Sequence, residues 1–184
     1  MMKVYEANVK DVLIIEPDVF SDNRGFFFES FSDYKYKEIG IKENFVQDNI
    51  SKSGYGTIRG LHYQIGEFAQ GKLCQVIQGK VLDVSVDIRF GSPTFGKWYS
   101  TELSEENHRQ IWIPPGFAHG FSVLSETAIF MYKCTAQYSK KDERGIIFFD
   151  EDLKIDWKVE VKNISEKDKL NKKFKDIDRD FIYS

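Results

Sequence analysis

The sequence contains three histidines, the side chains best suited to transferring protons near neutral pH. His62 lies in the segment RGLHYQ, within a predicted strand, and His119 lies in PPGFAHGF. His108 lies in a charged turn between Ser104 and Arg109, where we expect it to be solvated. His62 and His119 are therefore the histidines that are candidates for a functional site.

A metal site is the first chemistry that these histidines suggest. From Pro114 to His119 the spacing Pro-x-Gly-x-x-His matches the second half of the metal-binding motif of cupins. The first half of that motif carries a His-x-His pair, but here Gln64 stands two positions after His62. Because a stable metal centre needs three or four good ligands, the sequence favours a site without a catalytic metal.

Without a metal, His62 is better interpreted as a general base. A single histidine in a strand is more often a satisfied core residue, and the residue alone leaves that alternative open. Its surroundings favour the base, because polar and charged side chains fall in or beside neighbouring predicted strands: Arg59, Lys72, Tyr132, Lys133 and Glu143.

The elements that would hold these side chains are short β-strands. The clearest is Val81–Arg89, whose residues alternate between an apolar and a polar set: Leu82, Val84, Val86 and Ile88 against Asp83, Ser85, Asp87 and Arg89. This period of two gives the strand one apolar and one polar face. The polar face lies either inside a wet barrel or at its rim, and both placements stay open.

Further strands and two short helices complete the pattern. Helices are predicted at Ser32–Ile39, followed by Gly40, and from Ser165, where Ser-Glu-Lys-Asp resembles a capping box. Many short strands with few helices predict a sandwich or barrel, with the jelly roll as the leading candidate. The other predicted strands are Val12–Ile15, Gly25–Phe31, Phe45–Ser51, Thr57–Gln64, Leu73–Gln78, Lys97–Leu103, Gln110–Ile113, Gly120–Leu124, Ala128–Ala136 and Gly145–Phe149.

The composition predicts one folded domain over residues 1–184. Of these residues 41% are hydrophobic and 15% aromatic, which is enough to bury a core. The net charge of −3 gives no overall argument for binding nucleic acid or a membrane. Because the sequence shows neither a signal segment nor an apolar run long enough to span a bilayer, we expect a cytoplasmic protein with reduced Cys74 and Cys134.

Nine short segments, taken in order, carry a family resemblance. They are Asp22–Glu29, Phe45–Asn49, Ile58–Gln64, Gln70–Leu73, Asp83–Arg89, Ser92–Phe95, Pro114–Phe121, Tyr132–Thr135 and Ile164–Asp168. With them the sequence resembles the dTDP-4-dehydrorhamnose 3,5-epimerase family over nearly its whole length. The resemblance implies an all-β fold, a cupin-type jelly roll built as a double-sheet β-barrel with a few short peripheral helices. It also implies a homodimer that acts on a dTDP-sugar without a metal or other cofactor.

The chemistry implied by the resemblance is proton transfer next to a ketone. The 4-keto group of a dTDP-4-keto-6-deoxyhexose acidifies the hydrogens at C3 and C5, so a base can remove one and an acid on the opposite face can return it. By the resemblance, His62 is the base and Asp168 orients its imidazole. Tyr132 is the acid, and Lys72 faces the oxyanion that develops at C4.

Taken alone, these residues also have structural interpretations. Asp168 lies three residues after Ser165, at the N3 position of the predicted cap. Tyr132 would pack against Phe130 on the same strand face, and Lys72 would be an exposed residue at a strand end. The resemblance favours the catalytic roles, and for Asp168 the two roles are compatible.

The resemblance also implies a binding site for the nucleotide. Cationic groups of Arg24, Arg59 and Lys167 would neutralise the diphosphate. Arg24 and Glu29 would reach the active site of the partner subunit. The remaining family binding positions are Gln47, Asp48, Asn49, His119 and Glu143.

One conflict concerns the strand that carries Arg59 and His62. The two residues are three apart, so a regular strand would point them to opposite faces. Both can enter one pocket only if the strand is interrupted between them, and Gly60 makes a β-bulge plausible. We therefore predict a bulge at Gly60.

The favoured function is inversion of C3 and C5 of dTDP-4-dehydro-6-deoxy-D-glucose to give dTDP-4-dehydro-L-rhamnose, a step of dTDP-L-rhamnose biosynthesis. One alternative is an epimerase of C3 or C5 alone, and another is a ketoisomerase of a related nucleotide 4-keto sugar. A metal-dependent cupin such as a dioxygenase and a non-catalytic sugar-binding jelly roll are the rivals from other classes.

Overall fold

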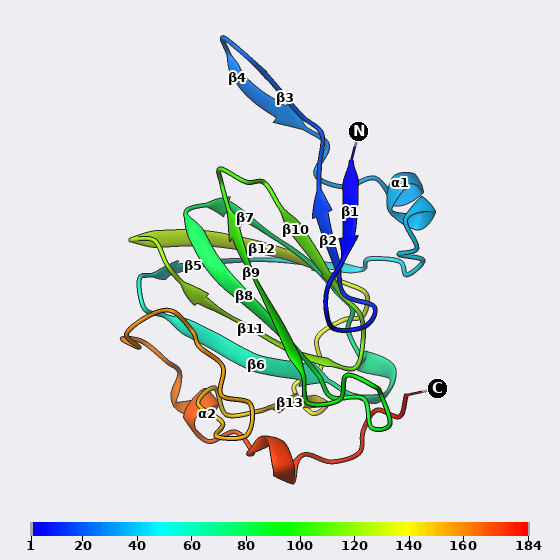
Figure 1. Cartoon of the computed structure of the whole chain (residues 1–184), viewed down its shortest axis with the longest axis vertical. Helices are drawn as coiled ribbons and strands as arrows, with labels where there is room; N and C mark the ends of the chain where they lie inside the picture. Colours follow the sequence, from blue (N-terminus) through cyan, green and yellow to red (C-terminus); the bar gives the residue numbers. More distant parts are fainter. Residues whose placement is uncertain (1, 184) are drawn as a thin grey trace.

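The computed structural model describes residues 2–183 and places two antiparallel sheets face to face (Figure 1). The six-stranded sheet has the order β1 (Lys3–Glu6), β2 (Leu13–Glu16), β10 (Gln110–Ile113), β7 (Lys72–Gln78), β12 (Thr127–Cys134) and β5 (Gln47–Gly54). The five-stranded sheet has the order β13 (Glu143–Gly145), β6 (Ile58–Gln64), β11 (Phe117–Val123), β8 (Lys80–Asp87) and β9 (Trp98–Ser104). This arrangement confirms the predicted cupin-type jelly roll.

The helices are short and lie at the periphery. They are α1 (Asp33–Glu38), α2 (Glu166–Lys169) and two 3-10 turns, Gly66–Phe68 and Phe174–Asp176. Helix α1 begins after Ser32 and ends before Gly40, which has a φ of 98°, so the predicted helix with its glycine stop is confirmed. No helix within residues 2–183 is long and apolar enough to cross a membrane.

Strand β8 shows why its sequence alternates. Its apolar residues, including Val84 and Val86, pack outward against the C-terminal segment, with Leu153 and Trp157 in the same cluster. Its polar residues face the other way, and Asp83 lies fully buried between the sheets, where it bonds to His119. Because the C-terminal segment covers the outer face, the polar face of this strand is the interior one.

Asp87 is also fully buried but serves the loop that follows β8. Its carboxylate accepts hydrogen bonds from Arg89, Ser92 and Thr94 at 2.6–3.0 Å. The sequence left open whether the polar face of this strand lies inside the barrel or at its rim. Asp83 lies inside the barrel, whereas Asp87 anchors the loop at the end of the strand.

The prediction of a strand at Gly145–Phe149 was wrong, because β13 ends at Gly145. Ile146 still exchanges backbone hydrogen bonds with Leu61 of β6, and from Ile147 onwards the backbone follows the C-terminal segment instead of the sheet. The Ile147 N–H donates to the Lys172 carbonyl at 2.9 Å, and the Phe148 carbonyl accepts the Trp157 indole N–H at 2.7 Å. The apolar character of this run comes from its burial under the outer face of the sheet.

A two-stranded hairpin projects from the body of the molecule (Figure 1). It consists of β3 (Val19–Asp22) and β4 (Gly25–Phe28), of which β3 was not predicted. We call residues 19–28 the arm. Its rings are largely uncovered, since Phe20 is 65% and Phe27 is 69% exposed.

His108 was predicted to be solvated, and this was wrong. The ring centroid of His108 lies 4.6 Å from that of Phe26 and 5.1 Å from that of Phe28, both on the arm. The imidazole is therefore partly covered by aromatic rings.

The outer face of the six-stranded sheet is only partly covered. Around α1, Tyr36 and Ile41 pack with Trp112 in a buried cluster. Nearer β5 and β7 the same face is open, with Ile50 70% and Ile77 49% exposed. Exposed apolar side chains on this face are candidates for a contact surface.

Candidate active site

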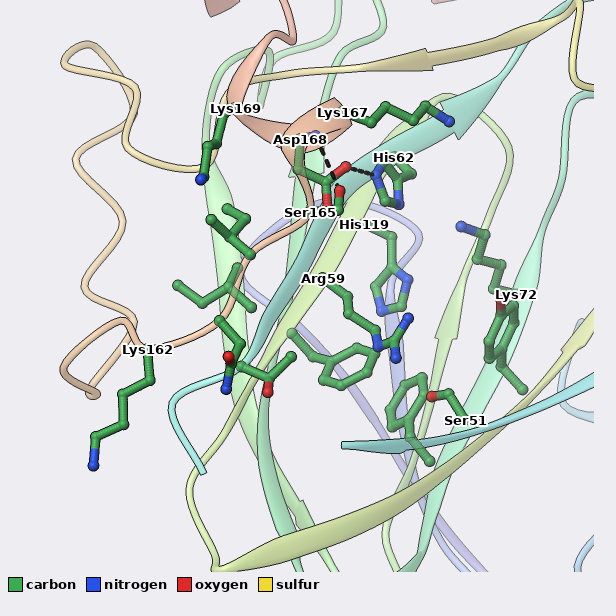
Figure 2. A pocket seen from close by; sticks show the side chains of 17 residues that line it. Ser51, Arg59, His62, Lys72, His119, Lys162, Ser165, Lys167, Asp168 and Lys169 are labelled. Carbon is green, nitrogen blue, oxygen red and sulfur yellow. Dashed lines mark hydrogen bonds and ion pairs between the residues drawn. The ribbon is translucent and has the colours of Figure 1, made fainter. Parts of the chain in front are cut away.

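A pocket of about 490 Å³ opens between the two sheets (Figure 2). Strand β6 and helix α2 form one wall, and strands β7 and β12 form the opposite wall. The sequence-predicted residues that line it are Arg59, His62, Lys72, His119, Tyr132, Lys167 and Asp168. The structure thus brings together the four residues predicted to be catalytic.

A β-bulge in β6 turns both Arg59 and His62 into this pocket. Arg59 pairs with Phe121 and His62 pairs with His119, so two residues of β6 face the single residue Gly120. Gly60 has a φ of 130°, and a Cβ there would lie 2.5 Å from the Cα of Gly120. Only glycine fits this position, and the predicted bulge is confirmed.

His62 and Asp168 form a short hydrogen-bonded pair. The His62 Nε2 lies 2.5 Å from Asp168 Oδ1, and the Asp168 side chain is buried while the imidazole is partly exposed to the pocket. Burial alone would raise the pKa of Asp168, but the hydrogen bond and charge of His62 outweigh it and hold this pKa below its ordinary value. Since Nε2 donates to the carboxylate, Nδ1 is the nitrogen that can accept a proton.

The same aspartate also serves the helix start, as the capping pattern predicted. The Asp168 backbone N–H donates to Ser165 Oγ at 3.1 Å (Figure 2). The cap uses the backbone of Asp168, so its carboxylate stays available to His62. Both interpretations of Asp168 therefore hold together.

Tyr132 and Lys72 lie on the wall opposite His62. Burial raises the pKa of Tyr132 to about 12, which keeps the phenol protonated through the neutral range. The Lys72 Nζ lies 5.9 Å from the centroid of the Tyr132 ring. The ring of Phe130 lies 5.8 Å from that of Tyr132, so Tyr132 also packs as a core aromatic.

His119 forms the floor of the pocket with two buried neighbours. Its Nε2 lies 2.9 Å from Asp83 Oδ2 and 3.9 Å from Cys74 Sγ. Burial lowers the pKa of His119 despite the charge of Asp83, and burial raises that of the Cys74 thiol well above its ordinary value. His119 is therefore a neutral hydrogen-bonding group at neutral pH.

Within residues 2–183, the group best able to hold a metal is this same trio, Cys74, Asp83 and His119. Their ligand atoms lie within 4.8 Å of one another. His62 does not belong to it, because its Nε2 is bonded to Asp168. Gln64, which occupies the cupin ligand position, donates to the carbonyls of Phe68 and Gln137 instead.

The rim of the pocket is held by a second network. Lys167 forms an ion pair with Glu143, and the Tyr138 hydroxyl donates to Glu143 at 2.7 Å. Burial would raise the pKa of Glu143, but these two partners outweigh it and lower that pKa. The Gln47 side chain accepts the Tyr138 N–H at 2.9 Å and donates to Asn49 at 3.0 Å.

The structure does not bring Arg24, Glu29 or Asp48 into this pocket. Arg24 is paired with Asp22 at the tip of the arm, and Glu29 is paired with Lys35 at 2.9 Å. The Asp48 side chain points to the outer face of the six-stranded sheet, since alternation along β5 separates it from its neighbours in sequence. It forms an ion pair with Lys133 at 2.9 Å there.

Several lining residues were not predicted. Ser51 continues the alternation of Gln47 and Asn49 along β5, so the period of two could have found it. Lys162 lies in an irregular segment without periodicity, so no sequence signal indicates it. The others are Thr57, Ile58, Phe121, Phe130, Asn163, Ile164, Ser165 and Lys169.

Comparison with known proteins agrees with this geometry. A family model described as dTDP-4-dehydrorhamnose 3,5-epimerase matches residues 6–176. The chain is 54% identical over 178 residues to the dTDP-4-dehydrorhamnose 3,5-epimerase of Shigella flexneri, covering 96% of this chain and 98% of the relative. It is 52% identical over 179 residues to that of Pseudomonas aeruginosa, again covering 96% and 98%.

A solved structure shows the same fold with a bound sugar nucleotide. The crystal structure of dTDP-6-deoxy-D-glucose-3,5-epimerase from Legionella pneumophila, in complex with dTDP-4-keto-L-rhamnose, matches with a TM-score of 0.96 and 48% identity over 100% of both chains. On the family model, the relatives and this structure, the chain belongs to the dTDP-4-dehydrorhamnose 3,5-epimerase family.

Proposed function

We propose that the chain inverts C3 and C5 of dTDP-4-dehydro-6-deoxy-D-glucose and so makes dTDP-4-dehydro-L-rhamnose for dTDP-L-rhamnose biosynthesis. The observation that carries the proposal is the placement of a carboxylate-backed imidazole and a protonated phenol on opposite walls of one pocket. Inversion at carbon needs a base on one face of the sugar and an acid on the other.

In this reaction His62 Nδ1 removes the hydrogen from the carbon next to the ketone. The C–H electron pair becomes the enolate, and the imidazolium that forms is stabilised by Asp168 at 2.5 Å. Tyr132 returns a proton from the opposite wall, and its raised pKa suits it to protonating a strongly basic carbon. Before the second centre is inverted, the His62 imidazolium releases its proton to solvent and the tyrosinate takes one up from solvent.

Negative charge at the C4 oxygen needs fixed donors. Lys72 lines the pocket on the wall beside Tyr132 and can donate to this oxygen. A donor aimed at such an oxyanion contributes about 3 kcal/mol. His119, on the floor of the pocket, is not such a donor, because its Nε2–H donates to Asp83 and its neutral state leaves Nδ1 as an acceptor.

The nucleotide would extend from the sugar towards the rim. Arg59 and Lys167 offer charge to the diphosphate, and Gln47, Asn49 and Glu143 offer polar contacts. The reaction as proposed needs no metal or other cofactor, because the base, the acid and the oxyanion donors are side chains. The whole chain would act as one domain, since both sheets contribute to the pocket.

We also place the enzyme as a homodimer in the cytoplasm. The arm points its exposed Phe20 and Phe27 away from the protomer, and Ile50 and Ile77 form an open strip on the outer sheet face. A second copy that covers both would receive Arg24 and Glu29 at its pocket. The free, buried Cys74 and Cys134 suit a reducing compartment. We propose no nucleic acid or membrane partner.

Deuterium exchange tests the proposed reaction. The wild-type protein is incubated with dTDP-4-dehydro-6-deoxy-D-glucose in D₂O, and the product is identified by NMR. We expect deuterium at both C3 and C5 with both centres inverted. Exchange at one carbon would indicate a single-centre epimerase, and a moved carbonyl would indicate a ketoisomerase. Absence of any exchange would refute the function.

His62→Ala and Tyr132→Phe then assign the two roles. His62→Ala should abolish exchange, because the base is lost. Tyr132→Phe should impair inversion more than the initial C–H cleavage, because only the returning proton is lost. An equal loss of both steps in Tyr132→Phe would contradict its role as the acid.

A further inference from the structure

The arm is attached to its own protomer on one side only. Successive side chains of a strand point to opposite faces, so Phe26 and Phe28 share one face of β4 and Phe27 lies on the other. His108 stacks on Phe26 and Phe28, with ring centroids 4.6 Å and 5.1 Å away. The face with Phe27, which pairs with Phe20 of β3, is largely exposed, and Phe26 on the other face stays 61% exposed beside His108.

The turn that carries His108 is itself strongly ordered. Ser104 and Asn107 exchange hydrogen bonds of 3.1 Å between side chain and backbone, and the Arg109 N–H donates to Asn107 Oδ1 at 2.9 Å. His108 has a φ of 51°, in a region that residues other than glycine rarely adopt. A fixed turn in this conformation holds the imidazole in one direction.

The next residue of the turn, Arg109, binds the chain just before the arm. Arg109 binds Glu16, the last residue of β2, at 2.8 Å and 2.9 Å. The arm begins three residues later, at Val19. The turn therefore holds the end of β2, three residues before the arm, through Arg109 and contacts one face of the arm through His108, at the place where the arm leaves the body (Figure 1).

We infer that His108 is a positioning residue that aims the arm, so that Arg24 reaches the pocket of a second copy of this chain. The inference rests on the proposed homodimer. His108 touches neither the pocket of its own protomer nor its catalytic residues, since its aromatic contacts are to the arm. Its effect on catalysis is therefore indirect and acts on the partner's site.

Steady-state kinetics with His108→Ala and His108→Phe test the inference. An aromatic pair contributes enough for roughly a tenfold effect. We expect His108→Ala to raise KM roughly tenfold with little change in kcat, because the arm binds substrate and does not react. His108→Phe keeps a ring against Phe26 and Phe28, so it should stay close to wild type. Equal impairment of both variants would overturn the inference.

A double-mutant cycle shows whether His108 acts through the arm. If it does, His108→Ala should add no further loss to Arg24→Ala. A full additional loss in that background would overturn the inference. If Arg24→Ala itself has no effect, the role of the arm in the partner's site fails, and the inference fails with it. If Arg24→Ala impairs the enzyme and His108→Ala does not, only the inference fails.

Mixed dimers show whether His108→Ala impairs the pocket of its own protomer or the pocket of the partner. His62→Ala and His108→Ala subunits with different tags are co-expressed, and the heterodimer is purified. One of its pockets keeps His62 and receives an arm supported by an intact His108. We expect that pocket to show the wild-type KM and half the wild-type activity per dimer. A KM that stays raised would place the defect in the protomer that carries the change and would overturn the inference.

Discussion

The pocket and the arm differ in how their side chains are held. In the pocket, three functional candidates are held by partners within the same chain: His62 by Asp168, Asp168 by Ser165 and His119 by Asp83. In the arm, Arg24 is 85% exposed along its side chain and pairs only with its neighbour Asp22, while Phe20 and Phe27 lie open. The side chains of the pocket are therefore fixed within one chain, whereas those of the arm have few contacts with their own protomer.

This difference predicts two kinds of mutational effect. Changes in the pocket should act on the chemical step or on the stability of the protomer, and they should not depend on dimer formation. Changes in the arm should act on substrate binding and should be complemented in mixed dimers. The following predictions test that division, from the largest expected effect to the smallest.

Removal of the base should have the largest effect. His62→Ala should lower kcat by roughly 10³- to 10⁴-fold, since general base catalysis is worth up to that much. Tyr63 lies next to it in β6 but packs in the outer cluster, so Tyr63→Phe is a matched control that should retain activity. Kinetics on both variants, with circular dichroism to confirm folding, test this. Substantial activity in His62→Ala would refute the assignment.

Gly60→Ala should destabilise the protomer by about 3 kcal/mol, because its Cβ would meet the Gly120 backbone at 2.5 Å and its φ of 130° would become strained. Gly25→Ala in the arm is the control that sharpens the comparison. Gly25 has a similar φ of 124° but nothing within 4 Å, so only the backbone strain of about 1 kcal/mol should remain. Urea unfolding measures both. Equal losses would mean that the close approach at the bulge is unimportant.

Arg24→Ala should lower kcat/KM roughly 100-fold through KM, because a charged hydrogen bond to the diphosphate is worth about 2–3 kcal/mol. Lys97→Ala removes an exposed cation of the body and should change little. A heterodimer of Arg24→Ala and His62→Ala subunits should recover one pocket with wild-type KM. Failure to recover it would place Arg24 in the pocket of its own protomer and break the contrast between the two regions.

How well the structure could be predicted from the sequence also differs between the pocket and the arm. His62, Lys72 and Tyr132 could be placed together because alternation along strands and the family segments both indicate them, and Gly60 resolved the conflict with Arg59. The family segment Phe45–Asn49 suggested Asp48 as well, but alternation sends it to Lys133 on the outer face. A family motif indicates positions along the chain, but the alternation of side chains along a strand determines which of those positions share a face.

Other features could not be predicted because their causes lie outside local sequence. His108 sits in a charged turn, and only the tertiary position of the arm places Phe26 and Phe28 on its ring. The Gly145–Phe149 run has the composition of a strand, but after Ile146 its backbone bonds to the C-terminal segment, where the Ile147 N–H donates to Lys172. Arg24 and Glu29 lie outside the pocket of their own chain, paired with Asp22 and Lys35, so the family motif indicates their types but not their place.

The smallest predicted effect concerns the pH dependence of stability in the pocket. The pKa of Asp168 is held below its ordinary value in the folded protein, whereas in the unfolded chain it returns to about 4. The stabilisation from this carboxylate is therefore fully present above about pH 4 and is lost as the pH falls through the folded-state pKa. Asp168→Asn lacks it, so wild type should exceed the variant by about 1.5 kcal/mol at pH 7.

Urea unfolding of the two proteins from pH 7 to pH 2 measures this difference directly. Other carboxylates titrate alike in both proteins and cancel, so the difference should stay level down to about pH 5 and shrink below about pH 4. Asp22 in the arm also has a pKa lowered by a hydrogen bond, from Arg24, but it is fully exposed, so Asp22→Asn should show almost no such difference. A difference that does not shrink between pH 4 and pH 2 would mean that His62 does not hold the Asp168 carboxylate in its charged form, and the orientation proposed for the base would lose its support.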